Sequence, residues 1–412
     1  DLIDPVNDAS DFTNTAGTTS TLQGLGFDES NVIQQKINTD GQNPNSQKND
    51  FDGDDGLYQD GMFSAAIKVP DIASFKSAST FLWRDPVASN GNYGYATDLG
   101  IGTDALINAN GFFRYAEAVP GEWVTQLWEG RQTNAGGGAP AFDSNAVNLA
   151  GVTVRLNGDE TDAGLTVQRG EIRGNCKHNI ATIIFTFDDS TNTNYSVGYP
   201  KLSAKGWPAT DYTIPRLVGE SGKVTLAQLK EMQADGWVIG SHGLQNDSFD
   251  NIAEMTLEEQ IIELDAVRTW MQGNGLLGWR HYSYPEGERN ENSMAALKRL
   301  GYKTARALNT PASAGFVLAP GFSLYQLRAM NTNESTTGTG TYDSSILTDV
   351  VDEAIAEGPI IIFYTHGLLS PTLTNGHTDP QAYQDLLDHV ETAGASVQVK
   401  TIDELYNEAV SV

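Results

Sequence analysis

Two patterns of hydrophobic and polar positions divide the chain near residue 172. Up to about Gly174, short runs alternate between apolar and polar residues, and clusters rich in Gly, Asn, Asp and Thr separate them. We therefore expect an all-β, jelly-roll-like sandwich domain over residues 1–172, with an arm or loosely packed lead-in before Asn49. The alternating runs are GMFSAAIKV, STFLWRD, GFFRYAEAV, EWVTQLWEG, GVTVRLNG and AGLTVQRGEI.

Over residues 173–412, apolar runs of strand length alternate with runs of helical periodicity. This alternation predicts an α/β domain around a parallel sheet, either open or closed into a barrel. Thr225 with Gln228, and Thr256 with Glu259, have the spacing of capping boxes that begin helices. The expected strands are ATIIFTF, WVIGSH, YSYP, YKTARAL and PIIIFYTH; the expected helices begin at TLAQL, TLEEQ, ENSMA, SSILT and PQAYQ.

Polar residues follow four of the expected strands. Asp188 and Asp189 end the first, His242 ends the second, Glu286 lies in the turn after the third, and His366 ends the last. In parallel α/β folds the chemistry lies at the carboxyl ends of the strands. A histidine at a strand end is often only a core or capping residue, but four such ends together indicate a site.

Adjacent Asp188 and Asp189 repel each other unless a cation or solvent offsets their charge. A strand end exposed to solvent explains the pair without any function. The functional interpretation divides the work, so that one carboxylate binds a divalent metal and the other acts as a general base. His242 and Asn246, four residues apart, supply nitrogen and oxygen donors, and the imidazole favours zinc.

In this order, the strand ends resemble the motifs of the polysaccharide deacetylases, the NodB-homology domain of carbohydrate esterase family four. The resemblance covers about residues 180–408 and implies a distorted (β/α)7-type barrel. It also implies that Tyr282 and Tyr284 lie beside the substrate. The segments that carry it are TFDDS, SHGLQND, YSYPEG and YTHG.

The resemblance also implies a role for each residue of the site. Asp188 would be the base and His366 the general acid, while Asp189 and His242 would bind one divalent metal, usually zinc, with cobalt, manganese or nickel as alternatives. The backbone N–H of Glu286 would help to stabilise the oxyanion. The expected reaction is hydrolysis of an acetyl group from a polysaccharide.

The sequence departs from the family at the second metal-binding histidine. Asn246 stands there, and an amide oxygen is a weaker ligand than imidazole. The metal site would then be looser, select another metal or be inactive, unless the neighbouring Asp247 serves instead. Arg306 and Arg280 are candidates for the arginine that orients the base; Arg306 is better placed, and Arg328 is a candidate for the wall of the site.

The amino-acid composition narrows the classes of possible binding partner. With 25 Lys and Arg against 53 Asp and Glu, the formal charge is −28, which disfavours nucleic acid and anionic membranes. No apolar run approaches the length of a membrane helix. Cys176 is the single cysteine, so no disulfide forms within the chain. We expect an extracellular, cell-surface or virion-associated protein, and the oligomeric state stays open.

The first domain offers weaker signals. Trp83, Trp123 and Trp128 are of a type that stacks on sugar rings, although such aromatics more often fill a core. The acidic segment Asn49–Gly61 has the composition of a calcium loop, but Asp55 stands where an EF-hand has glycine. We interpret it as a solvated acidic loop and keep calcium as the alternative.

Three functions compete. The leading hypothesis is a metal-dependent polysaccharide deacetylase that acts on N- or O-acetyl groups. The second, motivated by Asn246, is a glycan-binding pseudoenzyme without hydrolytic activity. The third keeps the barrel but changes the substrate to an amide that is not part of a sugar.

Overall fold

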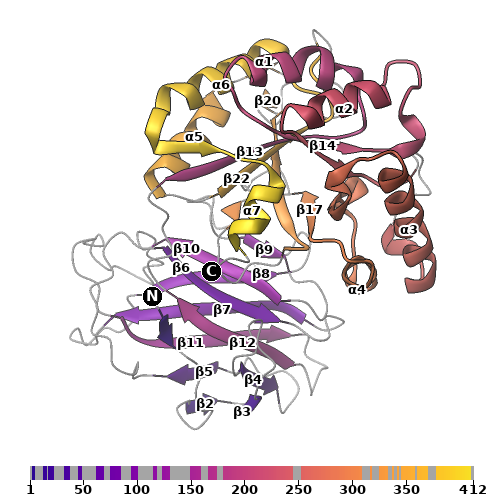
Figure 1. Ribbon diagram of the computed structural model, residues 1–412. Coiled ribbons are helices and arrows are strands. Elements are labelled where there is room, and N and C mark those ends of the chain that lie inside the picture. The colour runs from indigo at the N-terminus through magenta and orange to yellow at the C-terminus, as the bar shows by residue number, and fades with distance from the viewer. Residues whose placement is uncertain are drawn as a thin grey trace. The chain divides into compact units, whose positions relative to one another are not determined.

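The computed structural model divides the chain into two compact units, Asp1–Lys177 with Gly321–Ser323, and His178–Pro320 with Leu324–Val412 (Figure 1). It describes residues 180–244, 252–308, 324–332, 345–357, 360–369 and 377–409, and outside these ranges it describes only the backbone pairing of strands. The units meet at Lys177, whereas the sequence predicts a boundary at 172/173.

Within residues 1–173 the described strands pair into two six-stranded sheets. One runs β10-β6-β12-β4-β3 with β1 beside β12, and the other runs β2-β5-β11-β7-β8-β9. Strand pairs are antiparallel except β8 with β9. The bounds are β1 Leu2–Asp4, β2 Thr13–Thr15, β3 Gly17–Leu22, β4 Val32–Ile37, β5 Asn45–Lys48, β6 Met62–Lys68, β7 Phe75–Arg84, β8 Gly94–Gly100, β9 Tyr115–Glu117, β10 Trp123–Glu129, β11 Leu149–Gly158 and β12 Thr166–Arg173.

Each of the six alternating runs overlaps one of these strands, and β1–β5 occupy the stretch before Asn49 where an arm is expected. Packing of the two sheets into a sandwich stays a prediction. The acidic segment Asn49–Gly61, with its alternative calcium site, lies outside the described residues, as do the side chains of Trp83, Trp123 and Trp128.

In the second unit, seven described parallel strands close into a barrel, which confirms the predicted (β/α)7-type architecture. The ring runs β13-β14-β15-β16-β17-β19-β22 and closes where β22 pairs with β13. Two further strands extend it, antiparallel β18 beside β22 and parallel β23 beside β13. The bounds are β13 Ala181–Phe187, β14 Thr210–Thr213, β15 Val238–Ser241, β16 His281–Ser283, β17 Thr304–Leu308, β18 Phe316–Val317, β19 Leu327–Asn331, β22 Ile360–Thr365 and β23 Val397–Val399.

Helices flank these strands (Figure 1). Both predicted capping boxes are present, at Thr225 before α2 and at Thr256 before α3. No helix among the described residues is long and apolar enough to cross a membrane. The helices are η3 Asn194–Gly198, α1 Tyr199–Ser203, α2 Leu226–Ala234, α3 Leu257–Gly273, α4 Glu291–Leu300, α5 Ser345–Glu357, α6 Pro380–Ala393 and α7 Ile402–Ala409.

The contact between β15 and β16 is the shortest in the ring. These strands share a single register pair, Ser241 with Tyr282, whereas β13 and β22 share six. Side chains supplement it, because the Ser241 hydroxyl donates to the His281 carbonyl at 3.4 Å and the His242 ring contacts the Ser283 carbonyl at 2.9 Å. This contact is called the β15–β16 seam below.

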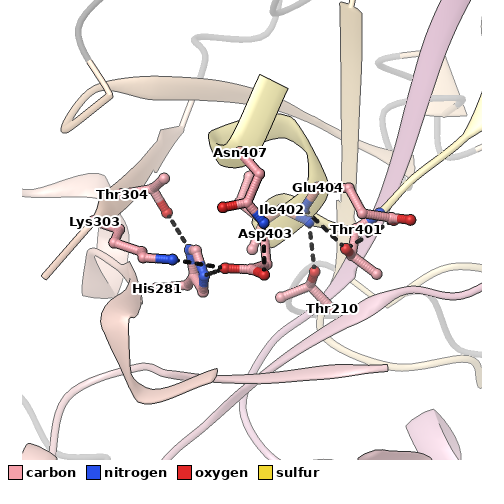
Figure 2. Close-up of polar contacts among 9 residues, drawn as sticks. All are labelled: Thr210, His281, Lys303, Thr304, Thr401, Ile402, Asp403, Glu404 and Asn407. Atoms are coloured by element: carbon pink, nitrogen blue, oxygen red, sulfur yellow. Dashed lines mark hydrogen bonds and ion pairs between the residues drawn. The ribbon is translucent and has the colours of Figure 1, made fainter. Parts of the chain in front are cut away.

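The last helix, α7, contacts residues at the amino ends of β14 and β16 and the residue just before β17 (Figure 2). Asp403 of α7 contacts Nε2 of buried His281 at 2.9 Å, and Thr304 contacts the other ring nitrogen at 2.9 Å. Lys303 lies 3.2 Å from the same carboxylate. Hydrogen bonding from His281 holds the pKa of Asp403 well below its usual range, and burial lowers the pKa of His281. Because both pKa values are lowered on folding, the unfolded chain binds protons at these groups more readily than the folded protein, and the fold loses stability in acid.

Gly240 of β15 lets the barrel close around the site. A Cβ atom at Gly240 would lie 2.7 Å from the Tyr212 ring and 2.8 Å from the His281 carbonyl oxygen. Tyr212 in turn packs against Arg306, whose Cζ lies 5.5 Å from the ring. The absence of a side chain at Gly240 therefore sets where the Tyr212 ring lies.

We expect Gly240→Ala to lower the free energy of unfolding by about 1–3 kcal/mol, because overpacking forces the Tyr212 ring or the backbone to move. Gly273→Ala is the matched control. A Cβ at Gly273 meets nothing within 4 Å, and alanine there should stabilise the end of α3 by about 0.5–1 kcal/mol relative to glycine. Urea denaturation measures both changes, and equal stability of the two variants would contradict the packing argument.

Candidate active site

The end of β13 carries the two neighbouring carboxylates. The N–H of Asp188 donates to the Thr365 carbonyl at 2.9 Å, so Asp188 lies beside the end of β22, where His366 follows. Asp189 and Ser190 then adopt positive φ of 65° and 53°. Such conformations are costly for residues other than glycine, and they persist only where the surroundings hold them. The chain turns sharply at this point, so Asp189 is partly exposed while Asp188 is buried.

Asp188 forms a buried ion pair with Arg306 of β17. The same guanidinium nitrogen contacts Oδ2 of Asp188 and the Ser283 hydroxyl, and both charged side chains are fully buried. Oδ1 of Asp188 is buried and has no hydrogen-bond partner among the described residues. One oxygen of the carboxylate is thus held by the arginine, and the other is left to accept a proton.

Two aromatic rings flank Arg306. Its Cζ lies 4.7 Å from the Tyr364 ring and 5.5 Å from the Tyr212 ring, distances that favour cation–π attraction. The Tyr364 ring also meets the His366 ring edge to face at 5.6 Å. Arg306 thus connects the environments of Asp188 and His366. The other candidate, Arg280, lies over Trp279 at 4.9 Å, just before β16 begins.

Asp189 and His242 form the second pair. Nε2 of His242 lies 3.5 Å from Oδ1 of Asp189, and Nδ1 lies 2.9 Å from the Ser283 carbonyl. A carbonyl oxygen only accepts, so Nδ1 carries a proton, and Nε2 is the nitrogen that faces Asp189. Metal-binding histidines commonly donate their other ring N–H to a carbonyl in this way, which leaves the opposite nitrogen for the metal.

Two residues of the site carry donor atoms suited to one divalent metal. Asp189 and His242 provide an oxygen and a nitrogen from the ends of β13 and β15, the strands on either side of β14, and the Asp189 carbonyl accepts from Lys223 Nζ at 2.8 Å. Among the described residues, no group of three or more His, Cys, Asp and Glu side chains is able to hold a metal ion. Asn246 and Asp247, the candidates for the third ligand, lie outside the described residues.

The turn after β16 presents Glu286. Pro285 starts the turn, Glu286 is exposed and has φ of 56°, and Gly287 follows with φ of 76°. Tyr282 and Tyr284 are fully buried, with their rings edge to face at 5.5 Å, and the Tyr284 hydroxyl donates to the Tyr325 carbonyl at 3.0 Å. Their role at the substrate stays a prediction.

Threonine hydroxyls support the turn that carries His366. The Thr365 hydroxyl donates to the Gly367 carbonyl at 3.0 Å and lies 2.8 Å from the Thr378 hydroxyl, which also contacts Thr332. The N–H of Thr378 donates to Gly367 at 2.9 Å. These contacts hold the backbone of the turn, and His366 itself is half-buried.

Several residues that hold the site in place carry no signal in the sequence. Ser283 joins both halves of the site, since its hydroxyl contacts Arg306 and its carbonyl contacts His242. Its place in YSYP gives no signal, because any residue supplies a carbonyl. Lys223 comes from a loop with no strand or helix pattern. Tyr212 lies on β14, whose sequence TDYT is too short and too polar to predict a buried strand.

Part of this site lies in a region that is similar to known proteins. The family model described as polysaccharide deacetylase matches residues 176–305. The chain is 27% identical over 123 residues to the Bacillus subtilis protein YxkH, which covers 29% of this chain and 42% of that protein. It is also 27% identical over 142 residues to a poly-beta-1,6-N-acetyl-D-glucosamine N-deacetylase of Staphylococcus aureus, covering 32% and 49%. The matched region therefore spans less than half the length of these relatives.

Among solved structures, a family 4 acetyl xylan esterase from Clostridium thermocellum in complex with a cobalt ion is similar at 15% identity. That match covers 55% of this chain and 91% of the esterase, with a TM-score of 0.36. The family match covers the first four strands of the barrel and the start of β17, including the ends of β13, β15 and β16. Residues 176–305 of this chain thus match the polysaccharide deacetylase family.

Proposed function

We propose that this protein is a metal-dependent deacetylase that hydrolyses acetyl groups on a polysaccharide. One observation carries the proposal: the buried Asp188 carboxylate is held by Arg306 at one oxygen and unpartnered at the other, one residue from the Asp189–His242 pair. A carboxylate of this kind is suited to take a proton from water beside a metal. The family match over residues 176–305 supports the same chemistry.

Asp189, His242 and Asn246 would hold one divalent ion, for which we propose zinc. Once bound, such an ion supplies Lewis acidity, which lowers the pKa of water and polarises the acetyl carbonyl. The His242 ring, with Nδ1 at the Ser283 carbonyl and Nε2 facing Asp189, supports this assignment. Cobalt, manganese and nickel accept similar ligands and are the alternatives.

The protein's own residues then divide the proton transfers. Asp188 takes the proton of the attacking water at Oδ1, while Arg306 keeps the carboxylate in place through Oδ2. The backbone N–H of Glu286 donates to the oxyanion, and Tyr282 and Tyr284 shape the wall behind that turn. His366, at the next strand end beside Asp188, protonates the leaving amine or alkoxide.

Acetylated glycans are the proposed substrate class. The Staphylococcus aureus relatives named poly-beta-1,6-N-acetyl-D-glucosamine N-deacetylase favour an N-acetyl group, and the name of the xylan esterase favours an O-acetyl group. Residues 1–172 are proposed to help hold the glycan. Because such polymers occur mostly outside cells, we propose an extracellular, cell-surface or virion-associated location. The charge of −28 favours a neutral or cationic polymer over an anionic one.

We expect Asp188→Asn and His366→Ala each to lower kcat for acetate release by about a hundredfold or more, because each removes one proton-transfer group. The matched control is His389→Ala. His389 lies on α6, where it contacts Asp352 at 2.7 Å, and its loss should leave kcat unchanged. Acetate release from N- and O-acetylated polysaccharides gives the rates, and circular dichroism checks the fold. Full activity in both site variants would refute the mechanism.

We expect chelation to abolish acetate release and Zn²⁺, Co²⁺, Mn²⁺ or Ni²⁺ to restore it to different degrees. Because imidazole binds zinc more strongly than an amide, Asn246→His should tighten the Zn²⁺ dissociation constant and Asn246→Ala should weaken it, each by about tenfold. Calorimetric titration with Zn²⁺ measures both without substrate. Identical affinities in the three proteins would exclude Asn246 as a ligand.

A glycan-binding pseudoenzyme is the second candidate function, and it is favoured by the presence of Asn246 where the family has its second metal-binding histidine. A folded, metal-loaded protein that binds an acetylated glycan but releases no acetate would establish it. Simple amides in the same panel separate the third hypothesis, since hydrolysis of those alone would mean a substrate other than a sugar.

A further inference from the structure

A third carboxylate is buried behind the site. Asp211 lies on β14 and is completely buried. Thr213 donates to its Oδ1 at 2.7 Å, and Asn194 donates to its Oδ2 at 3.0 Å. Both partners are neutral, so no cation among these contacts offsets the charge of Asp211. A buried charge without a counter-ion is costly, and such residues are rare unless they have a task.

Asn194 connects Asp211 to the catalytic turn. The amide nitrogen that donates to Asp211 also donates to the carbonyl oxygen of Asp188 at 3.2 Å, and the whole side chain is buried. Its amide oxygen has no hydrogen-bond partner among the described residues. The two contacts of the amide nitrogen therefore fix the orientation of the amide, and the stronger one goes to the charged acceptor.

The Asp188 carbonyl is the start of the strained turn. The next two residues, Asp189 and Ser190, have positive φ, and the turn sets the direction of both site carboxylates. Lys223 holds the Asp189 carbonyl at 2.8 Å, and the Ser190 hydroxyl accepts the N–H of Ile214 at 2.8 Å. Asn194 provides the matching restraint on the first residue. Without Asp211 to fix it, the Asn194 amide is free to rotate away.

Asp211 lowers stability at neutral pH. Its pKa is raised from 3.8 to about 7, mainly by burial; the hydrogen bonds from Thr213 and Asn194 act against this rise, and the charges of Asp188 and Asp189 add to it. Between these two pH values the folded protein binds more protons than the unfolded chain, so stability falls as pH rises through this range and stays low above it. A residue selected for stability alone would not be an aspartate.

We propose that Asp211 is a positioning residue of the active site, which acts through Asn194 to hold the Asp188 carbonyl and thereby aims Asp188 and Asp189. The geometry of the turn stands without any assumption about substrate; the effect on acetate release rests on the proposed function. Asp211 touches neither substrate nor metal in this scheme.

Two substitutions separate the hydrogen bond from the charge. Asp211→Asn keeps an oxygen that accepts from Asn194, whereas Asp211→Val fits a strand and removes the acceptor. We expect Asp211→Val to lower kcat for acetate release about tenfold or more with KM within about twofold, and Asp211→Asn to stay within about threefold of wild type. Asp211→Asn should also raise Tm at pH 8, with the gain disappearing by pH 5 because Asp211 is then protonated in the wild type.

The path through Asn194 has its own test. Asn194→Ala breaks the same link, so its effect on kcat and that of Asp211→Val should be far from additive. Additive losses, or an unchanged kcat in Asp211→Val, would overturn the proposal. An equal loss of kcat in Asp211→Asn and Asp211→Val, with a lower Tm in both, would also overturn it, because that pattern marks a purely structural role.

Calorimetric titration with Zn²⁺ keeps the proposal separate from the proposed function. Asp211→Val should weaken Zn²⁺ affinity about tenfold through misplacement of Asp189, and Asp211→Asn should weaken it less. If the wild type releases no acetate, the proposed function fails, and the Zn²⁺ affinities alone test the role of Asp211. Equal Zn²⁺ affinities in all three proteins would then overturn that role. Asp403→Asn is the control at the other end of the barrel, where it should lower Tm while leaving kcat and Zn²⁺ affinity unchanged.

Discussion

The buried ion pair between Asp188 and Arg306 is the interaction on which the site depends. Taking two charges out of water costs several kcal/mol per ion unless pairing and hydrogen bonds compensate. Arg306 receives this compensation from Asp188, from the Ser283 hydroxyl and from the Tyr364 and Tyr212 rings. These five residues come from β17, the end of β13, β16, β22 and β14. The contacts that surround the pair are therefore complete only when the ring of strands is closed.

Much of the barrel was predictable because its elements obey local rules. ATIIFTF and PIIIFYTH are apolar enough to be strands in any context, and the capping boxes at Thr225 and Thr256 are written in four residues each. Strand β14 could not be predicted from the sequence, because TDYT carries an aspartate that only tertiary contacts accommodate. The strand ends gave the pairing of Asp188 with Arg306 and of Asp189 with His242 as candidates. The supporting contacts of Ser283 and Asn194 depend on distances between segments far apart in sequence, which no local pattern contains.

Opposite ends of the barrel use carboxylates in opposite ways. At the amino end, Asp403 attaches α7 to His281 and Lys303, and its lowered pKa means that ionisation stabilises the fold. At the carboxyl end, the raised pKa of Asp211 means that ionisation opposes folding. The same side chain thus stabilises the fold beside α7 and opposes folding beside the turn that carries Asp188 and Asp189. A trade-off between stability and activity predicts such a division at a functional site.

The β15–β16 seam gives this barrel a property that closed barrels usually lack. A ring of strands has no edge, but a ring with one poorly paired contact has a preferred line of opening. Opening there would separate the His242 ring from the Ser283 carbonyl while the long β13–β22 ladder stayed intact. Amide hydrogen exchange would then be fastest at β16, and any ligand that bridges His242 to its neighbours would slow it. Ligand binding at the site would therefore change how often this part of the barrel opens.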